Sequence, residues 1–86
     1  MEVILTQKAA KDLDYWKKSG DNIKLKRIRI LLEVIAQTPY TGIGKPEALK
    51  FNYSGMWSRR IDQEHRIIYK VEDSVIQIVS LRKHYE

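Results

Sequence analysis

The sequence contains no cysteine and only two histidines among its 86 residues. Without thiols, the chain can form neither a disulfide framework nor a thiolate metal site, and two histidines are few for a metal centre of another kind. No apolar run approaches the roughly 20 residues of a membrane-spanning helix, and the N-terminus lacks the charged and apolar regions of a secretion signal. We therefore expect a cytoplasmic protein without a membrane span, a metal site or a cofactor.

Charge is abundant in this chain. Sixteen Lys and Arg residues against eleven Asp and Glu residues give a net charge of +5, and 43% of the residues are hydrophobic. This composition is typical of a soluble globular protein, and the length predicts a single domain, residues 1–86, with a small core. The positive charge favours an anionic partner, which could be nucleic acid, an acidic protein or an anionic membrane surface.

Hydrophobic periodicity predicts two helices in the N-terminal half. Thr6 is expected to cap the first helix, whose apolar residues recur every three or four positions until Gly20. Asp21 or Asn22 is expected to cap the second helix, and Pro39 is expected to stop it. Its buried stripe is predicted to consist of Ile23, Ile28, Leu31, Leu32 and Ile35. Its basic run, residues 24–29, is interpreted as a solvated face, with a rim that follows phosphates as the alternative.

Strand-forming residues dominate five further segments, namely 1–5, 49–53, 56–62, 65–71 and 75–81. Turn residues separate the last four, which we expect to form a three- or four-strand antiparallel meander. The predicted fold is α+β, with the N-terminal strand and the helical hairpin packed on one face of a twisted, mainly antiparallel sheet. The other face would be open to a ligand, and 40–46 is long enough to be a functional loop.

Residues 44–69 hold most of the candidate functional side chains. Because residues alternate between the faces of a strand, Arg59 and Arg60 should point to opposite faces, and one of them must turn toward the helices or bend aside. Arg66 begins the next predicted strand, where an antiparallel register could bring it beside Arg60 or its neighbour. Two interpretations stay open: an anion joins the guanidinium groups, or they form salt bridges with neighbouring carboxylates, namely Glu47, Asp62 and Glu64.

The chain ends with an imidazole and a phenol, His84 and Tyr85, just beyond the last predicted strand. That strand should lie beside the strand of Arg66 and return both groups to the same end or face of the sheet. Together with Glu47 they could cleave RNA: a base takes the proton of the 2′-hydroxyl, an acid protonates the leaving 5′-oxygen, and cations stabilise the transition state. His65 is expected to face away from Arg66 and is interpreted as structural.

Four sequence strings then point to a family: GKPEALK at 44–50, SGMWSRRI at 54–61, EHRIIY at 64–69 and KHY at 83–85. In these strings the chain resembles the YoeB/Txe family of toxins within the RelE superfamily, over essentially its whole length. The resemblance implies a type II toxin that cuts mRNA in the ribosomal A site as a metal-independent, ribosome-dependent endonuclease. It also implies a cognate antitoxin of the YefM/Phd/Axe type and often a homodimer.

The resemblance also assigns roles to single residues. It implies four catalytic residues, namely Glu47 as general base, Arg66 as transition-state stabiliser, His84 as general acid and Tyr85, which helps to place the nucleotide. It implies three residues that contact phosphate, namely Arg60, Lys45 and Lys50. Glu86 departs from the family's pattern by adding a negative charge beyond the terminal tyrosine.

Two other functions fit the basic charge. One is a non-nuclease toxin of the ParE type that acts on gyrase, and the other is a passive basic module that binds nucleic acid without breaking a bond. Both leave Glu47, His84 and Tyr85 without a task, so we favour the nuclease.

Overall fold

The computed structural model describes residues 1–83. The predictions for His84 and Tyr85, and the question raised by Glu86, therefore lie outside the described residues. Residues 1–83 form two α-helices, five strands and one 3₁₀ helix, in the order β1 (Glu2–Leu5), α1 (Gln7–Ser19), α2 (Asn22–Gln37), β2 (Glu47–Ala48), η1 (Phe51–Tyr53), β3 (Trp57–Arg60), β4 (Arg66–Glu72) and β5 (Val75–Ser80).

The helical hairpin begins and ends where the local sequence predicts. The Thr6 hydroxyl accepts a hydrogen bond from the backbone N–H of Ala9 at 3.1 Å, which caps α1. Gly20 ends α1 in the left-handed conformation, at φ 78°, which glycine adopts without a steric penalty. The Asp21 carboxylate then accepts from the N–H of Lys24 at 3.1 Å and caps α2. Local capping therefore sets the connection between the two helices.

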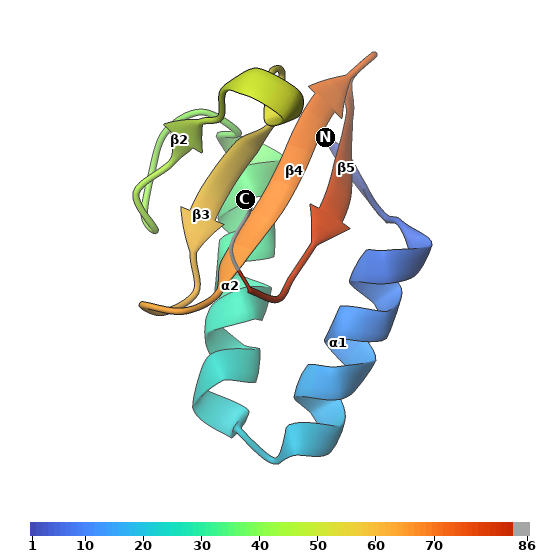
Figure 1. The fold of residues 1–86 in the computed structure, drawn as a ribbon, viewed down its shortest axis with the longest axis vertical. Coiled ribbons are helices and arrows are strands. Elements are labelled where there is room, and N and C mark those ends of the chain that lie inside the picture. Colours follow the sequence, from blue (N-terminus) through green and yellow to red (C-terminus); the bar gives the residue numbers. More distant parts are fainter. Residues whose placement is uncertain (84–86) are drawn as a thin grey trace.

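The five strands form one sheet in the order β1-β5-β4-β3-β2. β1 is parallel to β5, whereas the other neighbours are antiparallel. Figure 1 shows α2 running behind β3 and β4, with α1 beside β5. This arrangement confirms the predicted α+β class and the mainly antiparallel sheet, and neither α-helix of the described chain covers the opposite face of the sheet.

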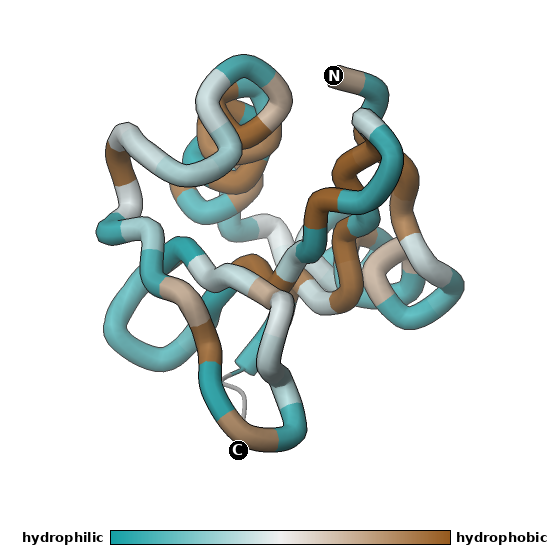
Figure 2. Tube along the Cα trace, turned by 90° about the horizontal axis from the view of Figure 1, so that it is seen from above, coloured by the Kyte–Doolittle hydropathy of each residue, from teal (hydrophilic) through white to brown (hydrophobic). Residues whose placement is uncertain are grey.

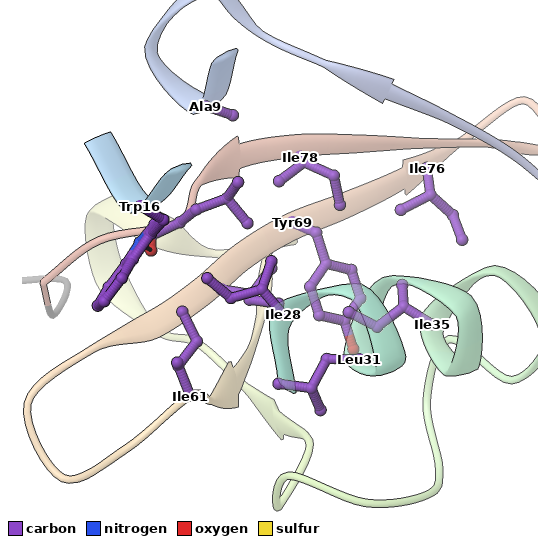
Figure 3. Close-up of a cluster of buried hydrophobic side chains, with 11 residues drawn as sticks. Ala9, Trp16, Ile28, Leu31, Ile35, Ile61, Tyr69, Ile76 and Ile78 are labelled. Carbon is purple, nitrogen blue, oxygen red and sulfur yellow. Dashed lines mark hydrogen bonds between the residues drawn. The ribbon is translucent and has the colours of Figure 1, made fainter. Parts of the chain in front are cut away.

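The core lies between the helices and the sheet. In Figure 2, α2 is seen end-on and carries both hydrophobic and hydrophilic residues, and its buried residues are Ile28, Leu31 and Ile35. In Figure 3, Tyr69 lies between Trp16 at one end of the buried cluster and Ile35 at the other. The prediction that Ile23 belongs to this cluster is wrong, because its side chain is 80% exposed. Ile23 precedes Ile28 by five residues, which places it roughly 140° around a helix of 3.6 residues per turn.

The predicted strand at 49–53 is also wrong. β2 is shorter and earlier, at Glu47–Ala48, and Phe51–Tyr53 forms the 3₁₀ helix η1. Phe51 has a φ of 57°, which a strand residue cannot adopt, and its side chain is 91% exposed. The aromatic residues that indicated a strand therefore form a surface turn. The correction moves Glu47 from a loop into the edge strand of the sheet.

Candidate active site

Three of the predicted site residues share the open face of the sheet. Glu47 of β2 pairs directly with Ser58 of β3, and Arg60 of β3 pairs directly with Arg66 of β4. Directly paired residues point to the same face of an antiparallel sheet, and so do residues two apart along a strand. Arg59, between Ser58 and Arg60, is buried against the helix side, so the other four residues lie on the opposite, open face. The predicted pairing of Arg66 with Arg60 is confirmed.

The Arg66 side chain reaches across the sheet toward Glu47. Its Nη1 donates a hydrogen bond to the hydroxyl oxygen of Ser58 at 3.2 Å. Ser58 is the residue paired with Glu47, so the guanidinium group extends from β4 to the residue beside the carboxylate. Ser58 was not among the predicted site residues. The alternation that separates Arg59 from Arg60 also places Ser58 on the face of Arg60, and this signal could have identified it.

The neighbouring carboxylates interact with other groups. Asp62 forms an ion pair with Lys24 at 3.4 Å, and the carboxylate of Glu64 lies 3.7 Å from the imidazole Nε2 of His65. Within residues 1–83, none of the three carboxylates considered from the sequence is ion-paired with Arg60 or Arg66. Asp62 and Glu64 are therefore engaged with other groups, and both interpretations of the two arginines stay open.

Arg59 holds the loop that leads to Glu47. Its side chain is fully buried, and its Nε donates to the hydroxyl oxygen of Tyr69 at 3.1 Å. Its Nη1 donates to the carbonyl of Ile43 at 3.1 Å, and its Nη2 donates to the carbonyls of Thr38 at 2.5 Å and Thr41 at 2.8 Å. The prediction that one arginine turns toward the helices is confirmed, and the 40–46 loop is a fixed structural segment around that arginine.

Gly44 completes the path from this loop to β2. It has a φ of 86°, and a Cβ built there would lie 2.8 Å from Cδ2 of Leu31. Its carbonyl accepts from the N–H of Arg60 at 2.7 Å, which ties the loop to β3 just before Glu47. Lys45 and Lys50 are exposed on either side of β2. The described part of the chain shows no hydrogen bond or ion pair between either lysine and the site.

The segment before His84 lies beside Arg66. The backbone N–H of Leu81 donates to the carboxylate of Asp12 at 3.0 Å, and its carbonyl accepts from Nε1 of Trp16 at 2.8 Å. Two residues further, the carbonyl of Lys83 accepts from the N–H of Arg66 at 3.1 Å. The structure therefore confirms that β5 returns the chain to Arg66, and it fixes the position of the residue that precedes His84.

His65 lies on the helix side, as predicted. Its ring packs edge-on against Trp16 of α1, with 4.9 Å between the ring centres, whereas Arg66 bonds to Ser58 on the open face. This packing agrees with its interpretation as a structural residue. His65 also makes a polar contact that the sequence did not indicate: its Nδ1 accepts a hydrogen bond from the N–H of Lys83 at 2.8 Å.

A cavity of about 250 Å³ adjoins the site on the open face. Its floor includes Ile68, the β4 residue paired with Ser58, and the neighbouring β5 residue Val79. Tyr53 of η1 forms one wall, and Lys83 also lines the cavity. An apolar floor with an aromatic wall can accept the face of a nucleobase. The cavity therefore offers space for a nucleotide on the same face of the sheet as Ser58.

Two further features concern residues 1–83 as a whole. No group of three or more His, Asp and Glu side chains in this range is placed to hold a metal ion. Neither helix within it combines the length and the hydropathy required to cross a bilayer.

A comparison with protein families shows to which family the chain belongs. The family described as the YoeB-like toxin of bacterial type II toxin-antitoxin systems matches residues 5–85. The chain belongs to this family. The match includes Glu47, Arg60 and Arg66, and it extends through His84 and Tyr85.

Curated relatives and solved structures agree with this assignment. The chain is 51% identical to Toxin YoeB of Synechocystis over 74 residues, which are 85% of this chain and 86% of the relative. The YoeB/ParE toxin from Agrobacterium tumefaciens superposes with a TM-score of 0.93 at 36% identity, over 99% of this chain and all of the other. A heterotetrameric YoeB–YefM complex and a YoeB dimer from Staphylococcus aureus each give a TM-score of 0.87 at 40% identity, over 99% and 98% of the two chains. This YoeB-like toxin is thus a toxin of a type II toxin-antitoxin system with the fold of its relatives.

Proposed function

We propose that this YoeB-like toxin is an mRNA endonuclease that cuts in the ribosomal A site. The observation that carries the proposal is an arrangement of side chains on the open face: the Arg66 guanidinium donates a hydrogen bond to Ser58, and Ser58 is paired with Glu47. Arg60, paired with Arg66, adds a second guanidinium on the same face. One carboxylate and two permanent cations around an open surface suit a reaction that removes a proton and builds negative charge on a phosphate.

The reaction needs only groups that this chain carries. Glu47 takes the proton of the 2′-hydroxyl, and the resulting 2′-oxygen forms a bond to the adjacent phosphorus. The bond from phosphorus to the 5′-oxygen breaks, and His84 gives that oxygen its proton. The products are a 2′,3′-cyclic phosphate, which can open to a 3′-phosphate, and a free 5′-hydroxyl. Arg66 stabilises the charge on the phosphorane-like transition state.

The other predicted residues position the RNA. Arg60 holds phosphate beside Arg66, and Tyr85 places the nucleotide. Lys45 and Lys50, exposed on both sides of β2, attract the RNA backbone at longer range, so their effect should weaken as salt is added.

The relatives support a proposal about partners. The Staphylococcus aureus YoeB structures include a complex with YefM and a dimer. We propose that this toxin binds a cognate antitoxin of the YefM/Phd/Axe type, forms a homodimer, and acts in the cytoplasm, where ribosomes translate. Besides mRNA and the ribosome, the proposed mechanism requires no metal or cofactor.

The test is cleavage of a defined mRNA on purified ribosomes, with the new 5′ ends mapped. Wild-type toxin should cut inside the A-site codon, and Glu47→Gln should lower the rate by about 10² to 10⁴-fold, the usual contribution of a positioned base. His84→Gln should have an effect of the same size. Glu33→Gln is the matched control, because Glu33 is an exposed carboxylate on α2.

The outcomes separate the three functions. Undiminished cutting by Glu47→Gln and His84→Gln would remove both assigned roles. DNA damage without mRNA breaks would indicate a ParE-like action on gyrase. Binding of RNA with no broken bond would indicate a passive module.

A further inference from the structure

His65 contacts the residue before His84 and directly precedes Arg66. Its Nδ1 accepts a hydrogen bond from the backbone N–H of Lys83 at 2.8 Å. Only a ring nitrogen that carries no proton can accept, so the contact requires Nδ1 to be unprotonated. On the other side of the same residue, the carbonyl of Lys83 accepts from the N–H of Arg66 at 3.1 Å. Both backbone polar groups of Lys83 are therefore held by two consecutive residues.

Lys83 needs this support because of its backbone conformation. Its φ is 67°, in the left-handed region that a lysine adopts only when its surroundings hold it there. The hydrogen bonds that Lys83 forms with His65 and Arg66 stabilise this conformation. Without the imidazole, Lys83 can relax to an ordinary φ, and the direction in which the chain continues into His84 changes.

The imidazole itself is firmly placed. The backbone N–H of His65 donates to the carboxylate of Asp62 at 2.6 Å, and its carbonyl accepts from the N–H of Ile61 at 2.9 Å. Its ring packs against Trp16, whose Nε1 donates to the carbonyl of Leu81 at 2.8 Å. His65 and Trp16 together hold the backbone of residues 81–83 against the turn that leads into β4.

We propose that His65 is a positioning residue for the proposed nuclease reaction. Through Nδ1 it fixes Lys83, and it thereby sets where the general acid His84 starts relative to Arg66. His65 itself touches neither the substrate nor the reacting atoms. The inference rests on the proposed function, because it assigns a task to His65 only if His84 is the acid.

Two variants separate positioning from packing. In His65→Asn, the amide oxygen can take the place of Nδ1 and accept from Lys83, whereas the longer side chain in His65→Gln places its amide nearer to where Nε2 was. Both variants lose the ring that packs on Trp16, so a purely structural role predicts the same defect in both. Positioning predicts that His65→Gln loses about 10²-fold in single-turnover rate, as for a reacting group displaced by roughly 1 Å.

The rate should largely survive in His65→Asn, and the KM for programmed ribosomes should stay close to the wild-type value in both variants. A second readout does not depend on activity: amide hydrogen exchange of Lys83, followed by NMR, should be slow in the wild type and in His65→Asn and fast in His65→Gln. Equal turnover and equal exchange in the two variants would overturn the inference. Failure of the proposed function would look different, because the wild-type toxin itself would make no cuts.

Discussion

Arg59 and Arg60 are neighbours in sequence but occupy opposite faces of the same sheet. Arg59, on the helix side, is fully buried and donates to four oxygen atoms of its own chain. Arg60, on the open side, is exposed and pairs with Arg66 across the β3–β4 ladder. Two arginines thus have different roles: Arg59 fixes a loop on one face of the sheet, and Arg60 presents positive charge to a ligand on the other. What decides between the two roles is the number of fixed oxygen atoms around the guanidinium.

The buried arginine is stabilised by dipoles. No carboxylate within residues 1–83 forms an ion pair with it. One of its acceptors is the carbonyl of Thr38, the residue that caps the C-terminal end of α2, where the helix dipole is negative. Burial raises the pKa of the Tyr69 phenol, which stays protonated and donates to the carbonyl of Pro39 at 2.6 Å. Arg59 can therefore remain charged in the interior without a counterion.

The largest expected effects come from removing one guanidinium on each face. Arg59→Met leaves the carbonyls of Thr38, Thr41 and Ile43 without their donor, and each unsatisfied group costs about 1 to 3 kcal/mol. We expect the free energy of unfolding, measured with urea, to fall by about 3 kcal/mol or more. Arg66→Met should change stability by only about 0.5 to 1 kcal/mol, yet it should lower the cleavage rate by about 10² to 10³-fold.

Each variant serves as the control for the other. If Arg66→Met unfolded the protein as strongly as Arg59→Met, the division between the two faces would be wrong. The same conclusion would follow if Arg59→Met kept wild-type stability and lost only activity.

The second prediction concerns Gly44, where the loop packs against Arg59 and Leu31. In Gly44→Ala, the new methyl group would meet Cδ2 of Leu31 at 2.8 Å and Cβ of Arg59 at 3.2 Å, in addition to the strained φ of 86°. We expect a loss of about 2 to 4 kcal/mol, the sum of overpacking and the left-handed backbone. Gly55→Ala is the control, because Gly55 has a φ of 91° and nothing within 4 Å of the new Cβ.

Gly55→Ala should therefore show the backbone cost alone, about 1 to 2 kcal/mol. Urea unfolding of both variants gives the comparison. Equal losses would mean that the loop is not packed tightly between α2 and Arg59.

The two arginines also show how far the sequence could predict the structure. Alternation along a strand placed them on opposite faces, but it could not say which one was inside, because that depends on carbonyls more than fifteen residues earlier in the chain. The helix caps at Thr6 and Asp21 were predictable because each acts within three residues of its own position. Local signals were sufficient where the contacts were local.

The errors lie where local signals were misleading or missing. Aromatic residues at 49–53 indicated a strand, but the positive φ of Phe51 and its exposure mark a surface turn. In the candidate site, Glu47, Arg60 and Arg66 could be named from their chemistry, and strand alternation could have added Ser58, whereas the contact between His65 and Lys83 could not be predicted. That contact joins residues 18 positions apart, and no periodic pattern encodes it.

The smallest expected effect concerns Asp62, whose carboxylate accepts hydrogen bonds from the backbone N–H groups of Glu64 and His65 in the turn between β3 and β4. Burial by itself would raise the pKa of Asp62, but the N–H groups of His65 and Glu64 and the ammonium group of Lys24 outweigh it, and the pKa lies below the usual 3.8. A carboxyl group with a lowered pKa in the folded state stabilises the protein above the pKa of the unfolded chain, and this stabilisation is lost as the pH falls through the folded value. Asp62→Asn should therefore lower the free energy of unfolding by about 1 kcal/mol near neutral pH, and the difference from wild type should shrink as the pH falls below 3.8.

Urea unfolding at neutral and acidic pH measures both values. Asp14→Asn is the control, because the Asp14 carboxylate is 57% exposed in its ion pair with Lys18 and should contribute little. A deficit in Asp62→Asn that is equally large at both pH values would show that the amide disturbs the turn sterically, and the charge of Asp62 would then have no part in holding His65.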